Sequence, residues 1–329
     1  MIGAGRWAEN CAHTLRQLHG APLVAISTRS VNGARRAASF APRAECTMDW
    51  RRVIRKKDVD AVIIVTPASS HYTIARAALE HGKHVFVEKP LTLSSRHARL
   101  LIRLAEKEDR VLMVGHLHRY NPAVERLRDD RERFGAIRYL VSTAMGDGPV
   151  REDVSALWDY MPHDLTIFRF VLGAEPLSVR ARGACFLGNG REDLVQAEFE
   201  FSKRVRAFST VSWLSPVKRR ELILSGSAGH AVFDDYATEK LRYYLPSTVG
   251  KGGPPNRVPR ISGTLPLTAE LRHFITCILR GRQPLTNGLE GLQVVRILEA
   301  CQRSLEKDGR RVRLGNSQKN TMNVRQGWG

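Results

Sequence analysis

Two patterns of apolar positions divide this chain. Up to about residue 116, stretches of helical period alternate with short apolar runs that are rich in Val and Ile. Because these runs are too short and too continuously apolar for amphipathic helices, we predict strands at 23–28, 61–66, 84–89 and 111–116. Gly20 and Gly82 stand where helices should end. The alternation predicts a doubly wound parallel sheet with helices on both faces.

Beyond about residue 120, apolar positions alternate with polar ones, which predicts a second, mainly antiparallel sheet. Its predicted strands are 178–186, 195–201, 205–213, 220–225 and 231–233. Two late stretches of helical period, 267–279 and 288–305, should pack back on the first domain or on this sheet. Residues 247–263 are rich in Gly and Pro, and we expect a mobile loop near a functional crevice or at a subunit contact.

Length and composition favour an α/β protein with two domains. At 329 residues and 43% hydrophobic, the chain exceeds the size at which a single core usually stops growing. We place the domains at 1–118 and 119–314 and expect the polar residues 315–329 to be disordered. Neither a secretion signal nor an apolar run near ~20 residues is visible, so we expect a cytoplasmic protein. The five scattered cysteines are predicted to be reduced packing residues, and no metal site is expected.

The net charge of +19 raises the question of a nucleic-acid partner. The arginines, however, occur in every segment and are interleaved with acids, as in residues 126–133, and no recognition helix or basic arm is set apart. Such a run is typical of a solvated helix face. We therefore expect neither a nucleic-acid nor a membrane partner, while the positive field would favour an anionic substrate or a phosphorylated cofactor.

A glycine-rich turn opens the chain, where residues 3–8 are Gly-Ala-Gly-Arg-Trp-Ala and a helical pattern follows at once. Glycines let the backbone turn tightly, so that a pyrophosphate can approach free amides at a helix N-terminus, where the helix dipole favours negative charge. Together with the alternating strands and helices, the turn predicts a Rossmann domain. The predicted dinucleotide-binding residues here are Gly3, Gly5, Arg6 and Trp7.

Only Met1 and Ile2 precede this turn, where a central strand of about five residues should run. The loss of about three buried aliphatic residues would remove roughly 5 to 9 kcal/mol of burial, which is comparable with the stability of a whole domain. We therefore expect that the first strand is truncated and that the natural start lies upstream.

The predicted strand 23–28 should end beside the adenosine ribose, where NAD enzymes carry an acidic residue. No Asp or Glu occurs between residues 10 and 44, and the strand leads into Thr28, Arg29 and Ser30, with Arg35 and Arg36 nearby. Guanidinium and hydroxyl groups match a 2′-phosphate, which a carboxylate would repel. NADP is therefore favoured over NAD; the alternative is that Arg29 is an exposed loop arginine.

Two further motifs carry candidate catalytic groups. Glu88, Lys89 and Pro90 close the apolar run 84–87 and place an amine where ligands of open α/β sheets bind, although a solvated turn is the alternative. Asp159 and His163 are four residues apart at the start of a helical stretch, so they share one helix face. That pair would supply a base near neutral pH and a group that orients a substrate, although a helix-start acid with a hydrogen-bonded histidine is the alternative.

In order and spacing, these motifs resemble the Gfo/Idh/MocA family of sugar and polyol oxidoreductases, from Gly3 to about Leu305. The resemblance rests on residues 3–7, on Thr66-Pro67 with His71, on Glu88-Lys89-Pro90, on Gly115-His116 with residues 119–122, and on Asp159 with His163.

The resemblance implies that Lys89, Asp159 and His163 form the catalytic set. His163 would take the proton of a substrate hydroxyl while the carbon passes hydride to the nicotinamide, Lys89 would polarise that oxygen, and Asp159 would fix the sugar. Residues implied to line the nicotinamide side are Thr66, Pro67, His71 and Glu88, and those implied to meet substrate are Arg119, Tyr120, Asn121 and Trp158.

Pro162 before His163 and Asp164 after it depart from the common family pattern and resemble the branch that handles nucleotide-linked or amino sugars. For His71, the alternative is a hydrogen bond to backbone, as it is for His116 and His118. Two other functions stay open: a non-catalytic NADP-binding sensor, and a dihydrodiol-type dehydrogenase or reductase on the same scaffold. Exposed faces of antiparallel sheets often pair, so we expect a homodimer or homotetramer.

Overall fold

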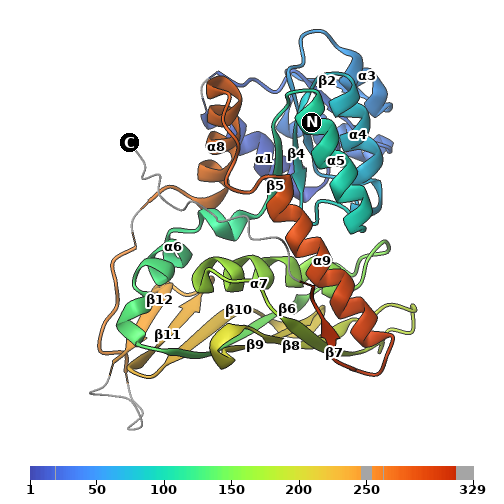
Figure 1. The fold of residues 1–329 in the computed structure, drawn as a ribbon. Helices are drawn as coiled ribbons and strands as arrows, with labels where there is room; N and C mark the ends of the chain where they lie inside the picture. The colour runs from blue at the N-terminus through green and yellow to red at the C-terminus, as the bar shows by residue number, and fades with distance from the viewer. Residues whose placement is uncertain (19, 246–253, 262, 316–329) are drawn as a thin grey trace.

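Two layered units lie one above the other in the folded chain (Figure 1). The computed structural model describes residues 1–18, 20–245, 254–261 and 263–315. The first unit, at the top of Figure 1, has parallel strands between helices, and the second has one broad sheet with helices on the side toward the first unit. The predicted α/β class, with a parallel and a mainly antiparallel sheet, is therefore confirmed.

The first unit contains the strands β1 (Ala25–Ser27), β2 (Glu45–Thr47), β3 (Ala61–Ile64), β4 (His84–Glu88) and β5 (Leu112–Gly115). β1 pairs with β2, and β3, β4 and β5 pair in that order, all in parallel. Ile2 forms parallel bridges with Ser27 and Ile64, so the first residues of the chain lie between β1 and β3. That the natural start lies upstream stays a prediction.

Helices α1 (Arg6–Gln17), α2 (Val31–Phe40), α3 (Trp50–Arg55), α4 (His71–Glu80) and α5 (Ser95–Lys107) cover these strands. The buried positions of α1 recur three and four residues apart, at Ala8, Cys11, Ala12 and Leu15, as its apolar spacing predicts. Gly82 follows α4 with φ +70°, the left-handed conformation that glycine adopts at a helix end.

The second unit is an eight-stranded sheet in the order β12-β11-β10-β6-β9-β8-β7-β13. All neighbours are antiparallel except β6 and β9. Five strands lie where two-residue alternation predicts them: β7 (Ser178–Ala184), β8 (Leu194–Glu200), β9 (Arg206–Ser212), β10 (Leu214–Gly226) and β11 (Gly229–Asp234). Three others were not predicted: β6 (Ile137–Asp147), β12 (Leu241–Tyr244) and β13 (Val312–Arg313).

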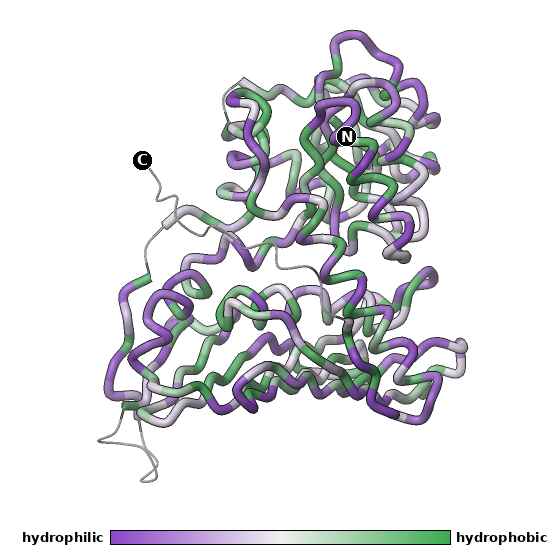
Figure 2. The backbone as a smooth tube through the Cα atoms, in the orientation of Figure 1, coloured by the Kyte–Doolittle hydropathy of each residue, from purple (hydrophilic) through white to green (hydrophobic). Residues whose placement is uncertain are grey.

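Four further helices join the two units: α6 (Pro122–Asp129), α7 (Ala156–Leu172), α8 (Pro266–Arg280) and α9 (Gly288–Leu305). α7 lies on the broad sheet, on the side toward the first unit, and most of its residues are buried. The two predicted late helices pack back as expected, α8 against α1 and α9 against α5 and β7. Figure 2 shows hydrophilic residues along the outer turns, while green apolar stretches follow the strands and helices inside.

Short 3-10 turns complete the described chain: η1 (Ala68–Ser70), η2 (Leu117–Tyr120), η3 (Arg131–Phe134) and η4 (Ser202–Arg204). The cysteine prediction is wrong in part, because Cys46 and Cys185 are exposed while the other three are buried, and all five are free. The expected tail and much of the Gly- and Pro-rich stretch 247–263 lie outside the described residues. Within the described residues, no helix combines the length and apolar character that crossing a membrane requires. A cytoplasmic location stays a prediction.

Candidate active site

Lys89 and Asp159 meet where the end of β4 faces the first turn of α7. Lys89 Nζ donates to Asp159 Oδ1 at 3.0 Å and to the Asp159 carbonyl oxygen at 2.5 Å. The two side chains are 15% and 9% exposed, so the pair is largely shielded from water. Two residues seventy positions apart are thus brought into one small volume at the carboxyl end of the parallel sheet.

Asp159 also has partners on its other oxygen. Trp213 Nε1 donates to Oδ2 at 3.2 Å, and Arg151 Nε lies 3.5 Å from the same atom. Burial alone would raise the pKa of Asp159, but the charges of Lys89 and Arg151 together with the hydrogen bonds outweigh it and hold the pKa below its usual range. The carboxylate is therefore ionised at neutral pH.

His163 lies one helical turn beyond Asp159 on the same face of α7. Its Nδ1 is buried and has no hydrogen-bond partner among the described residues, which leaves Nε2 as the nitrogen that can reach a substrate. Burial, reinforced by the charges of Lys89 and Arg220, lowers the pKa of His163 well below its ordinary value. A neutral imidazole is the form that can accept a proton.

Two more histidines surround this side chain. The ring of His118 meets that of His163 edge-on at 4.9 Å between centroids, and His116 Nδ1 lies 3.2 Å from Thr166 Oγ1. Burial, with Arg169 and Lys89, lowers the pKa of His116 to about 3. His116 and His118 therefore contact other side chains at the site, whereas the alternative considered from the sequence was a hydrogen bond to backbone.

His71 has the backbone role. Its ring nitrogens lie 2.8 Å from the Pro90 carbonyl oxygen and 2.9 Å from that of Thr66, so the buried ring ties together the two loops that follow β3 and β4. Thr66 Oγ1 in turn accepts a hydrogen bond from Ser70 Oγ at 2.7 Å. His71 thus holds together the loop that carries Thr66 and Pro67 and the loop that carries Lys89. That these residues line the nicotinamide side stays a prediction.

Sequence reasoning did not identify the groups that approach from the broad sheet. Trp213 follows β9, and Arg220 on β10 lies 3.7 Å from Asp164 Oδ1, whose partner oxygen accepts from Ser209 Oγ at 2.6 Å. Burial raises the pKa of Asp164. The alternation of β10 marks it as a strand, but no local signal tells which of its residues faces α7, because that depends on the register with β6.

The glycine-rich turn fits a dinucleotide. Gly3 has φ +110°, and a Cβ there would lie 2.5 Å from the Val65 carbonyl oxygen, so only glycine allows this close approach. A Cβ on Gly5 would meet nothing within 4 Å, so the space beside it is open for a pyrophosphate. α1 starts at Arg6 with no side-chain cap, which leaves its first amides available for an anion.

The turn also connects to the catalytic strand. Trp7 Nε1 donates to Glu88 Oε1, so the residue before Lys89 is held by the helix that starts at the turn. At the adenosine end, Ser30 Oγ caps α2 by accepting from Gly33 N at 3.0 Å, Thr28 adjoins Gly33, and the Arg29 side chain is exposed. These positions leave both interpretations of Arg29 open.

The four predicted substrate residues have partners within the protein. Arg119 stacks on the Phe170 ring at 3.5 Å, and Tyr120 is buried with its hydroxyl 3.3 Å from Thr286 Oγ1. Asn121 Oδ1 accepts from Ala123 N at 3.0 Å and so caps α6. Trp158 Nε1 donates to Gln302 Oε1 at 3.3 Å. Their polar atoms have packing or capping partners, so contact with substrate stays a prediction for them.

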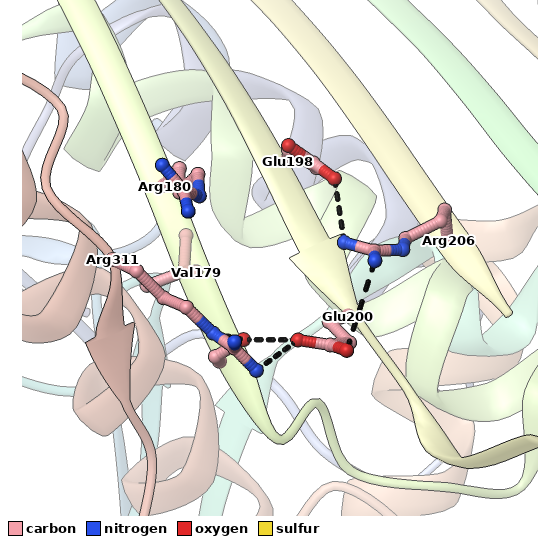
Figure 3. A pocket seen from close by; sticks show the side chains of 7 residues that line it. Val179, Arg180, Glu198, Glu200, Arg206 and Arg311 are labelled. Atoms are coloured by element: carbon pink, nitrogen blue, oxygen red, sulfur yellow. Dashed lines mark hydrogen bonds and ion pairs between the residues drawn. The ribbon is translucent and has the colours of Figure 1, made fainter. Parts of the chain in front are cut away.

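A small hollow of about 80 Å³ lies away from this site, on β7, β8 and β9 and beside β13 (Figure 3). Its carboxylates are paired: Arg206 contacts Glu198 at 2.7 Å and Glu200 at 3.7 Å, and Arg311 also contacts Glu200. The carboxylates that line the hollow in Figure 3 are therefore already paired with arginines of the protein.

Comparison with known proteins shows the family of this chain. Residues 1–116 match the oxidoreductase family model with an NAD-binding Rossmann fold, and residues 130–232 match the GFO/IDH/MocA C-terminal domain. A protein from Magnetospirillum magnetotacticum MS-1 assigned as an oxidoreductase is 35% identical, with a TM-score of 0.81 over 91% of this chain and 97% of that one. The chain belongs to the Gfo/Idh/MocA family of oxidoreductases.

Two relatives carry more specific names. UDP-N-acetylglucosamine 3-dehydrogenase of Acidithiobacillus ferrooxidans is 29% identical over 288 residues, which cover 85% of this chain and 91% of that protein. GenD2 of gentamicin A biosynthesis, solved in complex with NAD, is 26% identical with a TM-score of 0.82 over 96% of this chain and 95% of that one.

Proposed function

We propose that this protein is a nicotinamide-dependent dehydrogenase that oxidises a hydroxyl group of a sugar or sugar derivative, or reduces the corresponding ketone. The observation that carries the proposal is the contact of Lys89 with the ionised Asp159, one turn from the neutral His163, at the end of strand β4. A bound nicotinamide would supply the hydride chemistry.

The residues divide the remaining work. His163 Nε2 accepts the proton of the substrate hydroxyl, because its imidazole is neutral and Nδ1 is buried. The Lys89 ammonium donates to the same oxygen and stabilises the charge that develops there. Asp159 holds the Lys89 side chain in position, and it can accept a hydrogen bond from a second hydroxyl of the sugar. The presence of all three groups favours an enzyme over a non-catalytic sensor.

The principal test replaces the two groups that handle the proton. Lys89→Met and His163→Asn should each lower kcat by a hundredfold or more, while the Kd for the nicotinamide nucleotide changes little, since neither residue belongs to the glycine-rich turn. Lys83→Met, at the opposite end of β4, is the control. Undiminished turnover in either active-site variant would refute the assignment. Titration with NAD and NADP in parallel tests the preference for NADP.

A nucleotide-linked sugar is the substrate class that the surrounding charges favour. The Tyr160 ring has the Arg220 guanidinium 5.9 Å from its centroid, and the Tyr160 hydroxyl lies beside the backbone at Gly146, where the Lys218 side chain also lies. With Arg151 next to Asp159, three cations lie near Asp159 and Tyr160, which are consecutive residues of α7. A diphosphate would be attracted there, and the name of the Acidithiobacillus relative carries such a substrate.

Lys218→Ala tests this class with little risk to the fold, because Lys218 is exposed. We expect KM for UDP-N-acetylglucosamine to rise about tenfold with little change in kcat, and KM for the free amino sugar to stay the same, because one charge-assisted contact is lost. The exposed Lys307→Ala is the matched control. Equal effects on both substrates would argue against a diphosphate at this position.

A further inference from the structure

The imidazole of His163 lacks the hydrogen bond that commonly orients a base. A histidine that accepts protons is often held by a carboxylate or a backbone carbonyl at its second ring nitrogen. His163 Nδ1 is buried, and it has no hydrogen-bond partner among the described residues. α7 fixes the backbone of His163, so the orientation of the ring depends on the side chains that pack against it.

The ring that meets His163 is that of His118 on η2. The two ring centroids lie 4.9 Å apart, and the ring planes cross at 88°, which is the edge-to-face arrangement that aromatic rings prefer. His118 in turn meets the fully buried Phe233 of β11, with centroids 6.4 Å apart and planes at 79°. Two ring contacts thus connect the helix that carries the base to the broad sheet.

The segment that carries His118 is anchored on both units. η2 follows β5, where the chain passes from the first unit to the second. Arg119 stacks on Phe170 of α7 at 3.5 Å, and the Tyr120 hydroxyl lies 3.3 Å from Thr286 Oγ1. The side chain of His118 is buried, and its Nδ1 has no hydrogen-bond partner among the described residues. Its ring is therefore held by an anchored backbone and by packing.

We propose that His118 is a positioning residue: its ring, supported by Phe233, holds the His163 imidazole in the orientation that accepts the substrate proton and keeps water away from it. The inference deepens the proposed function and rests on it, because it takes His163 as the base. A carboxylate at Nδ1 would orient the base but would also stabilise its charged form. A ring contact orients the base and leaves it neutral.

A pair of variants separates the ring of His118 from the charges around His163. Besides burial, the pKa of His163 responds to charged and titratable groups of other segments, which are Lys89 at the end of β4, Arg220 on β10, His116 after β5 and His118 on η2. The acids near it on its own helix are Asp159 and Asp164. His118→Phe and His118→Ala both remove the same titratable group and leave all the others. The two variants differ only in the ring, so the difference between them measures its packing.

Turnover is the first readout, with UDP-N-acetylglucosamine as the substrate. His118→Ala should lower kcat about ten- to a hundredfold, because a displaced base loses its alignment with the substrate hydroxyl. His118→Phe should keep kcat within about threefold of the wild type, because a ring of similar size is tolerated in a packed site. The Kd of the nicotinamide nucleotide should stay unchanged in both variants.

The titration of His163 is the second readout, and it needs no substrate. Its ring signals in NMR spectra, assigned by their absence in His163→Asn, should remain those of a neutral imidazole in the wild type and in His118→Phe. In His118→Ala, water reaches the ring, so the pKa of His163 should rise toward its ordinary value of about 6.5. Phe233→Leu removes the second ring contact of His118 and should change both readouts in the same direction by less. His97→Ala, which removes a ring stacked on Tyr72 at 3.9 Å in the first unit, is the control.

Equal losses in His118→Phe and His118→Ala would show that the ring nitrogens matter and not the ring, and would overturn the inference. Wild-type kcat with an unchanged titration of His163 in His118→Ala would overturn it as well. If His118→Ala does not fold, Phe233→Leu carries the test, and wild-type values of both readouts in that variant decide against the inference. Undiminished turnover in His163→Asn would instead overturn the proposed function.

Discussion

Asp159 keeps its charge inside the protein because its carboxylate meets a donor or a cation on each oxygen. Lys89 serves Oδ1, while Trp213 and Arg151 serve Oδ2. Removing one partner of a buried charge is costly, because the charge then remains buried without compensation. The position of Lys89 therefore depends in part on Trp213, which acts on the lysine through Asp159.

Trp213→Phe isolates that contribution. The indole N–H is lost while the aromatic packing is largely kept, so the carboxylate loses one charge-assisted hydrogen bond worth about 1.5 to 3 kcal/mol. We expect kcat/KM to fall about ten- to a hundredfold and the Kd of the nucleotide to stay unchanged. Trp50→Phe, on α3 of the first unit, controls for the loss of a tryptophan as such. A Trp213 variant with wild-type kcat/KM would show that the bond does not support catalysis.

The residues of the candidate site were predictable only where local chemistry marks them. Lys89 follows an apolar run, and Asp159 and His163 share a helical spacing, so each leaves a signal in its own segment. Trp213, Arg220 and Arg151 join the site through the register of the broad sheet and the loop before α7, and that information is spread over many residues.

At the scale of elements, the two glycines of the turn before α1 have different roles. Gly3 is required by the fold, because a side chain would collide with the backbone of Val65. Gly5 has φ −78° as the residue before α1 and open space around it, so the fold itself tolerates a methyl group there. Its lack of a side chain matters for what approaches the first amides of the helix.

Gly3→Ala should therefore affect the stability of the fold, whereas Gly5→Ala should affect nucleotide binding. Gly3→Ala should lower the free energy of unfolding by about 2 to 4 kcal/mol, since it adds both a steric clash and an unfavourable positive φ. Gly5→Ala should leave the thermal midpoint nearly unchanged and weaken the Kd of the nucleotide about tenfold, because the methyl group occupies the pyrophosphate position. Thermal unfolding and nucleotide titration of both variants check this. The same loss of stability in both variants would contradict it.

The elements that could be predicted are those whose own residues are buried on a regular period. β3, β4 and β5 are covered on both faces and show as continuous apolar runs, and α9 lies within the bounds predicted for it. β2 has two exposed residues among its three, and in β6 the exposed pair Arg138 and Tyr139 precedes the alternation. Such segments are stabilised by the neighbouring strands, so the sequence of the segment itself does not predict a strand.

At the scale of the whole molecule, the two faces of the broad sheet differ. α7 and α9 cover one face, while the other presents Tyr139 and Phe208, which are 39% and 40% exposed on the adjacent strands β6 and β9. A homodimer or homotetramer through this face stays a prediction. Ionisable groups with shifted pKa values lie in both units, and these groups decide how the stability of the molecule responds to pH.

Two sets of groups act in opposite directions on stability. Histidines whose pKa is lowered in the folded state stay neutral there and bind protons on unfolding, so they destabilise the fold as pH falls below about 6.5. Carboxyls whose pKa is raised keep their protons in the folded state, so they destabilise the fold as pH rises above about 4.5. The first set is His71, His84, His116, His118, His163 and His273. The second set is Glu88, Glu125, Asp164 and Glu270.

Below about pH 4.5 the histidines act without opposition, and each contributes up to about 1.4 kcal/mol per pH unit, so stability should fall steeply there. Above about pH 6.5 the carboxyls lower the stability, opposed up to about pH 8 by the buried Met1 amine, whose pKa burial lowers to about 5, so stability should decline gently. We therefore expect the urea midpoint to peak near about pH 6.5, far below the isoelectric point of 10.3. Removing one carboxyl in Glu270→Leu should raise the midpoint increasingly above pH 4.5 and move the peak to higher pH. A peak near the isoelectric point, or an effect of Glu270→Leu that does not vary with pH, would mean that net charge, not these buried groups, governs the stability of the molecule.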